Sequence, residues 1–267
     1  FVPMARSLQP EDITESWSDW GAGLGSEPVV LDELSDGRSN HSYLLDSDIG
    51  KLVLRINGAS SLLPGASRDT ETSIWQAASQ QGIAPPLVFV DAQNQYLVSR
   101  YIGTDLPSQP QHNPACIEQA LSLLQRCHRI EIEAPSINYF DHIEHYWRII
   151  ESGNEPPSLI LNKQREPMLL LLESLLGSNS PTGLCHHDPV IANFVGTPGR
   201  LYLIDWEYAA TGLQIMDYAA LATEWQLGDS TVLKHSKCNP GLLTKAKRLY
   251  QYLCLLWDET SSQASFG

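Results

Sequence analysis

The strongest constraint on the fold is that strand signals and helix signals occupy different halves of the chain. Short apolar runs separated by turn-forming clusters fill the first hundred residues, whereas stretches of helical periodicity follow. Between the halves, the segment GTDLPSQPQHNP (103–114) contains one glycine and three prolines, which break regular structure. Segregated strands and helices favour an α+β fold over alternating strand and helix units. We therefore predict two lobes, residues 1–102 and residues 103–267.

The strand signals of the first lobe come in two groups. The runs VVLDEL, HSYLLD and KLVLRIN are separated by the turn clusters SDGRSN and SDIG, which predicts an antiparallel meander. A helix that stops at a glycine follows, and then a hairpin. In the second lobe, predicted helices flank a strand-and-loop block at 184–206. The predicted strands lie at 29–34, 41–46, 51–57, 87–90 and 96–101, and the predicted helices at 68–82, 115–129, 138–151, 164–176, 215–226 and 240–257.

Charge and cysteine content narrow the class of partner. The 17 Lys and Arg residues stand against 31 Asp and Glu residues, and the net charge of -14 argues against a nucleic-acid partner or an anionic membrane surface. Such a field would suit a cationic substrate. The five cysteines have no CxxC spacing, which fits free thiols in a reducing compartment. Without an apolar run of membrane-spanning length or a signal-peptide pattern, we expect a cytoplasmic protein. The sequence leaves the oligomeric state open.

The segment LCHHDPVIANFVGTPGRLYLIDWE (184–207) carries the most specific chemical signal. It places His186, Asp188 and Asn193 in an H-x-D-x-x-x-x-N pattern, and an apolar strand delivers Asp205 twelve residues after Asn193. Phosphoryl transfer needs a carboxylate near the attacking hydroxyl and oxygen ligands for magnesium ions that bridge the phosphates. Asp188 is therefore the candidate base, Asn193 and Asp205 are candidate metal ligands, and His186 is a candidate brace for the loop. Any one of these residues alone is more often structural, but their joint order indicates a phosphotransferase.

The runs CHHDPVIANF and LIDWEYA resemble the catalytic and metal motifs of the aminoglycoside phosphotransferase and choline kinase superfamily. The nearest branch is similar to the bacterial choline/ethanolamine and thiamine kinases. The resemblance implies a protein-kinase-like two-lobed fold, with a small antiparallel-sheet lobe that binds nucleotide and a larger helical lobe that holds the catalytic loop and the acceptor. It also implies ATP and Mg²⁺ as cofactors and the hydroxyl of a small molecule as acceptor.

The resemblance extends to the first lobe. By that mapping, LVLRI (52–56) is the strand with the phosphate-binding base, so Arg55 takes the usual lysine's place, and Glu71 on the helix of RDTETSIW (68–75) pairs with it. A guanidinium can clamp phosphate oxygens bidentately, and a glutamate can hold it in position. By spacing alone, the two residues could equally be unrelated surface charges.

Two further segments resemble parts of a nucleotide site. The loop within 34–45 has one glycine, Gly37, so its candidate phosphate donors are Ser35, Ser39 and Asn40. The segment 96–103 falls where the family has its interlobe hinge, which makes the main chain of Arg100, Tyr101 and Ile102 a candidate for adenine recognition. In the catalytic loop, His187 takes a position that the family often fills with a small or polar residue, and its ring could crowd or tune the loop.

The residues after the metal motif suggest the kind of acceptor. An acidic and aromatic pair recurs in the corresponding segment of choline and ethanolamine kinases, and aromatic faces attract a quaternary ammonium by about 0.5–2 kcal/mol each. Core packing is the commoner fate of aromatics at helical spacing. Asp217 is predicted to be structural, tying the start of its helix to the catalytic block. The candidate acceptor-binding residues are Trp206, Glu207, Glu224, Trp225 and Trp257.

Together these features favour a cationic amino alcohol such as choline or ethanolamine. Thiamine fits about equally well, and an aminoglycoside is less favoured. The alternative from another class is a nucleotide-binding pseudokinase or regulatory module, against which the joint presence of Asp188, Asn193 and Asp205 argues. A protein kinase is disfavoured because no activation segment with an APE-like motif follows Asp205.

Overall fold

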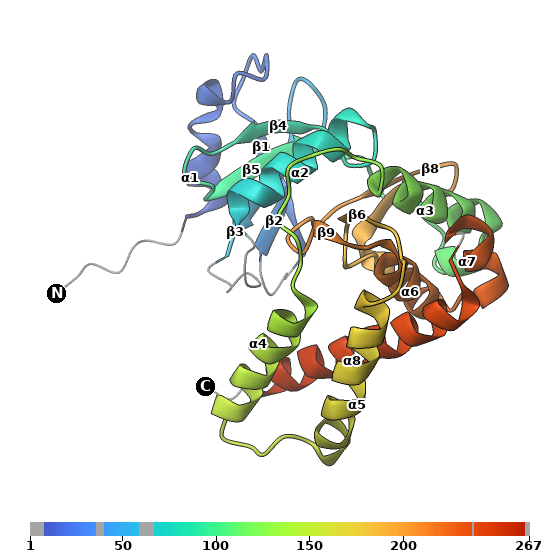
Figure 1. The fold of residues 1–267 in the computed structure, drawn as a ribbon. Helices are drawn as coiled ribbons and strands as arrows, with labels where there is room; N and C mark the ends of the chain where they lie inside the picture. The colour runs from blue at the N-terminus through green and yellow to red at the C-terminus, as the bar shows by residue number, and fades with distance from the viewer. Residues whose placement is uncertain (1–7, 36–39, 59–66, 237, 265–267) are drawn as a thin grey trace.

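The computed structural model describes residues 8–35, 40–58, 67–236 and 238–264 and has two lobes (Figure 1). The smaller lobe consists of a five-stranded sheet with helix α2 packed on it, and the larger lobe is mainly helical. The prediction of an α+β fold with an antiparallel first lobe is therefore confirmed. The strands of the sheet, in spatial order, are β1 (Val29–Ser35), β2 (Asn40–Asp46), β3 (Leu52–Asn57), β5 (Tyr96–Arg100) and β4 (Leu87–Val90).

The sheet buries one face by alternation of side chains. Every neighbouring pair of strands is antiparallel, and Arg55 of β3 lies opposite Ser42 of β2 and Leu97 of β5. Leu52 and Leu54 of β3 are fully buried in a small core that also holds residues of the two preceding short helices. These are α1 (Pro10–Thr14) and the 3-10 helix η1 (Trp17–Trp20), neither of which the periodicity of the sequence predicted.

Helix α2 (Arg68–Gln80) carries an acidic residue on its buried face. Ser67 caps its first turn by accepting a hydrogen bond from the Thr70 amide. Its buried residues recur at intervals of three and four, which is the period of one helical face. Glu71 belongs to that face together with Ile74 and Ala78, so its carboxylate points inward rather than into solvent.

The larger lobe contains the predicted helices, with three differences, one of which is that the last helix continues to Ala264 instead of ending at residue 257. Helix α5 begins five residues before the predicted start, because Ser158 caps it by accepting from the Leu161 amide and the helix continues through Pro167. Helix α7 was not predicted, since eight residues give too few turns for a clear period. The helices are α3 (Pro114–Cys127), α4 (Tyr139–Ser152), α5 (Leu159–Leu176), α6 (Gln214–Glu224), α7 (Asp229–Ser236) and α8 (Pro240–Ala264), and the 3-10 helix η2 (Pro110–His112) precedes them.

The two loops that carry the candidate catalytic residues each begin and end at a short strand. Strand β6 (Thr182–Cys185) pairs with β9 (Ala210–Leu213), and β7 (Phe194–Thr197) pairs with β8 (Arg200–Leu203). The candidate catalytic loop therefore runs from β6 through the 3-10 helix η3 (Ile191–Asn193) into β7. The segment that contains Asp205 runs from β8 to β9. The two antiparallel strand pairs thus fix the positions of both loops relative to each other.

The two lobes share hydrogen bonds and apolar core. The Leu203 amide of β8 donates to the Ile83 carbonyl of the first lobe at 2.8 Å. Ile74 and Trp75 of α2 belong to the same buried cluster as the helices of the larger lobe. The boundary at residues 102 and 103 stays a prediction. In the described part of the chain, no helix is both long and apolar enough to cross a bilayer.

Candidate active site

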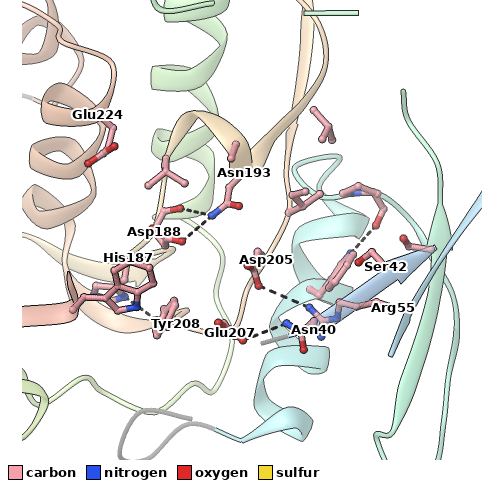
Figure 2. Close-up of a pocket in the computed structure, with 18 of the residues that line it drawn as sticks. Asn40, Ser42, Arg55, His187, Asp188, Asn193, Asp205, Glu207, Tyr208 and Glu224 are labelled. Carbon is pink, nitrogen blue, oxygen red and sulfur yellow. Dashed lines mark hydrogen bonds and ion pairs between the residues drawn. The ribbon is translucent and has the colours of Figure 1, made fainter. Parts of the chain in front are cut away.

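A cavity of about 1190 Å³ lies between the lobes and is lined by residues of both. Figure 2 shows Arg55 and Asn40 of the sheet on one side, Asp188, Asn193 and Glu224 of the helical lobe on the other, and Asp205 between them. The structure thus brings together predicted residues that lie far apart in the sequence, from Asn40 to Trp257. Those that line the cavity are Asn40, Arg55, Arg100, Tyr101, Ile102, Asp188, Asn193, Asp205, Glu207, Glu224 and Trp257.

The catalytic loop is held by its own side chains. Asn193 Nδ2 donates to Asp188 Oδ2 and to the Asp188 carbonyl, both at 2.9 Å, which fixes the carboxylate toward the cavity. His186 does not line the cavity: its fully buried ring lies edge-on to Trp206, with centroids 4.8 Å apart. Its Nε2 donates to the Ile204 carbonyl at 3.0 Å. This contact joins the loop to the segment that leads into Asp205, which agrees with the predicted bracing role.

Asp217 supports the same loop from helix α6. Its carboxylate accepts the His186 and His187 amides at 2.9 and 2.8 Å, and it also accepts His128 Nε2 at 2.9 Å. Burial alone would raise the pKa of Asp217, but the hydrogen bonds and charge of its partners hold that pKa at about 2. The predicted structural role fits this contact, although Asp217 binds the loop rather than capping its own helix.

Two carboxylates in the cavity have raised pKa values. Burial, together with the nearby charges of Glu224 and Glu207, raises the pKa of Asp188 to about 6 against the opposing hydrogen bond from Asn193. Burial and Glu207 raise the pKa of Asp205 to about 7, although Arg55 lowers it. The Asp205 side chain is 37% exposed, but this exposure is toward the cavity. Clustered carboxylates in a poorly hydrated space favour a bound cation.

Arg55 and Glu71 form the pair that the resemblance implied. Arg55 Nη1 lies 2.6 Å from Glu71 Oε1, and both side chains are buried. Burial alone would raise the pKa of Glu71, but Arg55 and Arg68 bring it below its ordinary value. Arg55 Nε and Nη2 have no hydrogen-bond partner in the part of the chain that the structure describes. Both atoms are buried in a residue that lines the cavity, and donors without a partner are candidates for phosphate oxygens.

Arg68 is a site residue that the sequence reasoning missed. Its Nη1 lies 2.8 Å from Glu71 Oε2 and 3.5 Å from Glu207 Oε2, and its Nη2 donates to Asn40 Oδ1 at 3.0 Å. Asn40 Nδ2 in turn donates to Glu207 Oε2 at 3.4 Å. Glu207, a candidate acceptor ligand, is thus bound by the smaller lobe. The spacing of Arg68 and Glu71, three residues apart on one helix, is the signal that could have indicated the pair.

The predicted nucleotide segments are only partly free to bind a ligand. Ser39 lies outside the described residues, and only the backbone of Ser35 is described, at the end of β1. The amides of Arg100 and Tyr101 donate to the carbonyls of Pro86 and Lys51, so they are not available to adenine. The Ile102 amide has no backbone partner among the described residues, so adenine recognition by this strand end would fall to that amide and to neighbouring carbonyls.

The assignment of Trp206 and Trp225 to the acceptor is wrong. Trp206 is fully buried and donates to the Leu203 carbonyl, and Trp225 packs edge-on against Phe194, so both belong to the core and neither belongs to the cavity wall that the described residues form. Four other aromatic side chains line the cavity, and the hydroxyl of one of them, Tyr250, donates to Glu224 at 2.9 Å. These are Tyr146, Tyr208, Tyr250 and Trp257.

The fold and the cavity define a class, that of kinase-like phosphotransferases whose two lobes enclose a small-molecule site. Comparison with protein families is specific: the model described as the phosphotransferase enzyme family matches residues 30–237, and the chain belongs to that family. The resemblance to the aminoglycoside phosphotransferase and choline kinase superfamily is therefore confirmed. The family match does not identify the particular acceptor of the phosphate.

The chain is similar to LicA proteins and to a solved choline/ethanolamine kinase family protein. Protein LicA of Haemophilus influenzae is 26% identical over 210 residues, which are 76% of this chain and 61% of that protein. The solved choline kinase LicA of Streptococcus pneumoniae has 21% identity and a TM-score of 0.74, with coverage of 95% of this chain and 91% of that one. A choline/ethanolamine kinase family protein of Mesorhizobium loti has 21% identity and a TM-score of 0.71, with coverage of 92% and 84%. These structures confirm the kinase-like fold.

Proposed function

We propose that the chain transfers the γ-phosphate of ATP to the hydroxyl of a small cationic amino alcohol, with Mg²⁺ as the metal. The observation that carries the proposal is the position of Asp188. Its carboxylate lies in one cavity between the Arg55 side, which suits phosphates, and an acceptor end with Glu224 and aromatic rings. A carboxylate in that place can accept the proton of a hydroxyl that attacks phosphorus.

The residues present fit a magnesium nucleotide. Asp205 Oδ1 is buried without a hydrogen-bond partner among the described residues and lies 3.9 Å from Arg55 Nη1. Asn193 and Asp205 would hold Mg²⁺, and Arg55 Nε and Nη2 would bind phosphate oxygens. When bound, the ion neutralises negative charge that develops on the phosphate oxygens. The protein's own part is to orient the reacting groups, which can supply several kcal/mol of the rate enhancement.

Asp188 has properties suited to a base. A pKa near 6 leaves the carboxylate mostly ionised at neutral pH, while it is a stronger base than an exposed aspartate. Asn193 donates one hydrogen bond to the carboxylate and one to the backbone carbonyl of Asp188, and His186 and Asp217 hold the loop behind it. The side chain therefore reaches the hydroxyl with little freedom left to lose.

The acceptor end favours an amine that carries positive charge. Glu224 and Glu207 supply negative charge, and Tyr146, Tyr208 and Tyr250 supply ring faces that attract a cation. The LicA relative in Streptococcus pneumoniae is a choline kinase, which supports choline or ethanolamine as the first acceptors to test. Thiamine and aminoglycosides belong to the same test as rival acceptors.

The test is transfer of labelled γ-phosphate from MgATP to five acceptors: choline, ethanolamine, thiamine, an aminoglycoside and a hydroxylated sugar. Transfer to choline or ethanolamine, with kcat/KM well above that for the sugar, is the expected result. Preferred transfer to thiamine or the aminoglycoside would replace the proposed acceptor but keep the reaction. Binding of MgATP without transfer to any acceptor would favour a regulatory module.

A further inference from the structure

His187 has a backbone conformation that its residue type disfavours. Its φ is 64°, in the left-handed region, which costs a residue with a β-carbon about 1–2 kcal/mol. Glycine would adopt this conformation at little cost. His187 also directly precedes the candidate base, and its amide donates to Asp217 Oδ1 at 2.8 Å. Contacts of the imidazole could offset the free-energy cost of this backbone conformation.

The ring of His187 lies in an ordered chain of hydrogen bonds. The Tyr208 carbonyl, 3.2 Å from Nδ1, can only accept, so the proton of the neutral ring is on Nδ1 (Figure 2). Nε2 then accepts from the Tyr139 hydroxyl at 3.1 Å, and that hydroxyl accepts the Leu213 amide at 3.0 Å. Burial lowers the pKa of His187, which favours this neutral form. Every donor in this series of hydrogen bonds, from the Leu213 amide to the His187 ring, therefore has an acceptor.

Strand β9 leaves room for this ring only because residue 212 is glycine. A β-carbon at Gly212 would lie 2.6 Å from His187 Nε2 and 2.6 Å from the Tyr139 hydroxyl oxygen. Real β-carbons do not approach other atoms so closely, so any other residue would displace one of the two side chains. Gly212, Tyr139 and His187 therefore form one fitted arrangement drawn from three separate elements.

We propose that His187 is a positioning residue that fixes the base and the acceptor wall relative to each other. Its backbone carries Asp188, and its ring holds the main chain of Tyr208, whose side chain lines the same cavity. The inference rests on the proposed function, because it concerns the acceptor of that reaction. It predicts that loss of the ring impairs phosphate transfer to the acceptor without weakening the binding of MgATP.

Replacement of the ring separates positioning from stability. His187→Gly removes the disfavoured φ but also the two hydrogen bonds of the ring, so the melting temperature should change little or fall modestly. At the same time kcat should fall about ten- to a hundredfold and the acceptor KM should rise, with MgATP affinity unchanged, since small displacements of reacting groups have effects of that size. His187→Asn, which also tolerates the left-handed region, should behave in the same way.

A second pair of variants displaces the ring without altering it. Gly212→Ala should reproduce the kinetic change of His187→Gly, because the new methyl group occupies the space of Nε2. Gly199→Ala is the matched control, since a β-carbon there meets nothing within 4 Å, and it should leave kcat unchanged. Tyr139→Phe, which removes the hydrogen bonds of the hydroxyl to His187 and to the Leu213 amide, should lower kcat little further when it is combined with His187→Gly.

The experiment is steady-state kinetics of these variants with the acceptor that the wild-type chain uses, beside MgATP binding and thermal melting. The expected pattern is reduced kcat in His187→Gly and Gly212→Ala at preserved MgATP affinity, with both variants still folded at the assay temperature. Wild-type kcat and acceptor KM in His187→Gly would overturn the inference while the proposed function stands. If the wild-type chain transfers phosphate to no acceptor, the proposed function fails and this inference fails with it.

Discussion

At the scale of single residues, burial decides which candidate side chains can do chemistry. Trp206 and Trp225 have the residue type expected at a cation site, yet both rings are core residues. Periodicity places a residue on a helix or strand but does not reveal which lobe covers that face. The places of Asp188, Asn193 and Asp205 in the cavity were easier to predict than those of the two tryptophans. The three residues occur in a motif of fixed spacing along the sequence, and that spacing itself indicates their chemistry.

His142 gives a prediction at the residue scale. Burial lowers its pKa from 6.5 to about 3, so the folded protein keeps this ring neutral. The unfolded chain takes up the proton below about pH 6.5. The stability due to the neutral ring is therefore complete above that pH and is lost as the pH falls, by at most about 1.4 kcal/mol per pH unit. Urea unfolding between pH 7 and 5 should show a shallower loss of stability for His142→Gln than for the wild type.

The control for His142→Gln is His112→Gln, an exchange of a 3-10-helix residue outside the cavity. That variant should keep the wild-type dependence of stability on pH. Asp188 and Asp205, whose raised pKa values act in the opposite sense, are present in all three proteins and cancel in the comparison. Parallel curves for His142→Gln and the wild type would show that His142 is not held neutral by the fold.

At the scale of elements, helix α6 supports the catalytic loop through one carboxylate. Asp217 accepts three hydrogen bonds from His128, His186 and His187. Asp217→Asn should reduce the free energy of unfolding by about 3 kcal/mol, because it leaves buried donors without a charged acceptor. Since the pKa of Asp217 is lowered to about 2, this contribution should persist from neutral pH down to about pH 4. Urea unfolding at pH 7 measures the difference.

The matched exchange for this prediction is Asp229→Asn. Asp229 pairs with Lys247 at 2.9 Å on the surface, so its loss should cost less than about 1 kcal/mol. Equal losses in the two variants would contradict the special role of Asp217. A fall in kcat for Asp217→Asn alone would further support its contact with the loop.

The elements also show where sequence reasoning is strong. The strands of the first sheet were predicted because alternating apolar residues and turn clusters mark them locally. Helix α7 and strand β9 were missed because eight and four residues carry little periodic signal. The early start of α5 was missed because Pro167 is tolerated in the first turn of a helix and so favours a start just before it, and only the cap at Ser158 indicates the true beginning.

At the scale of the whole molecule, the lobes meet through opposite charges around the cavity. Arg55 faces Asp205, and Arg68 and Asn40 bind Glu207. No local pattern reports such contacts, because each joins residues more than a hundred positions apart. The pairing across the cavity could be predicted only from the family resemblance, and Arg68 could not be predicted from it.

A bound magnesium nucleotide should therefore stabilise both lobes together. MgATP at a hundredfold excess over its Kd should add about 2.7 kcal/mol, whereas ATP with a chelator should add less. Asp205→Asn should raise the melting temperature of the free protein, because it removes repulsion among buried carboxylates, and should abolish the difference between the two nucleotide forms. Thermal melting of both proteins provides the measurement. An undiminished Mg²⁺ effect in the variant would contradict the ligand role of Asp205.

The most direct test of the central claim compares Asp188→Asn with the wild type on the acceptor that the wild type uses. The exchange preserves shape and the contact with Asn193 but removes the base. We predict a fall in kcat of about 10²- to 10⁴-fold, with MgATP affinity nearly unchanged because the base acts in the transition state. Turnover equal to that of the wild type would contradict the account of this cavity as a site of phosphoryl transfer with Asp188 as base.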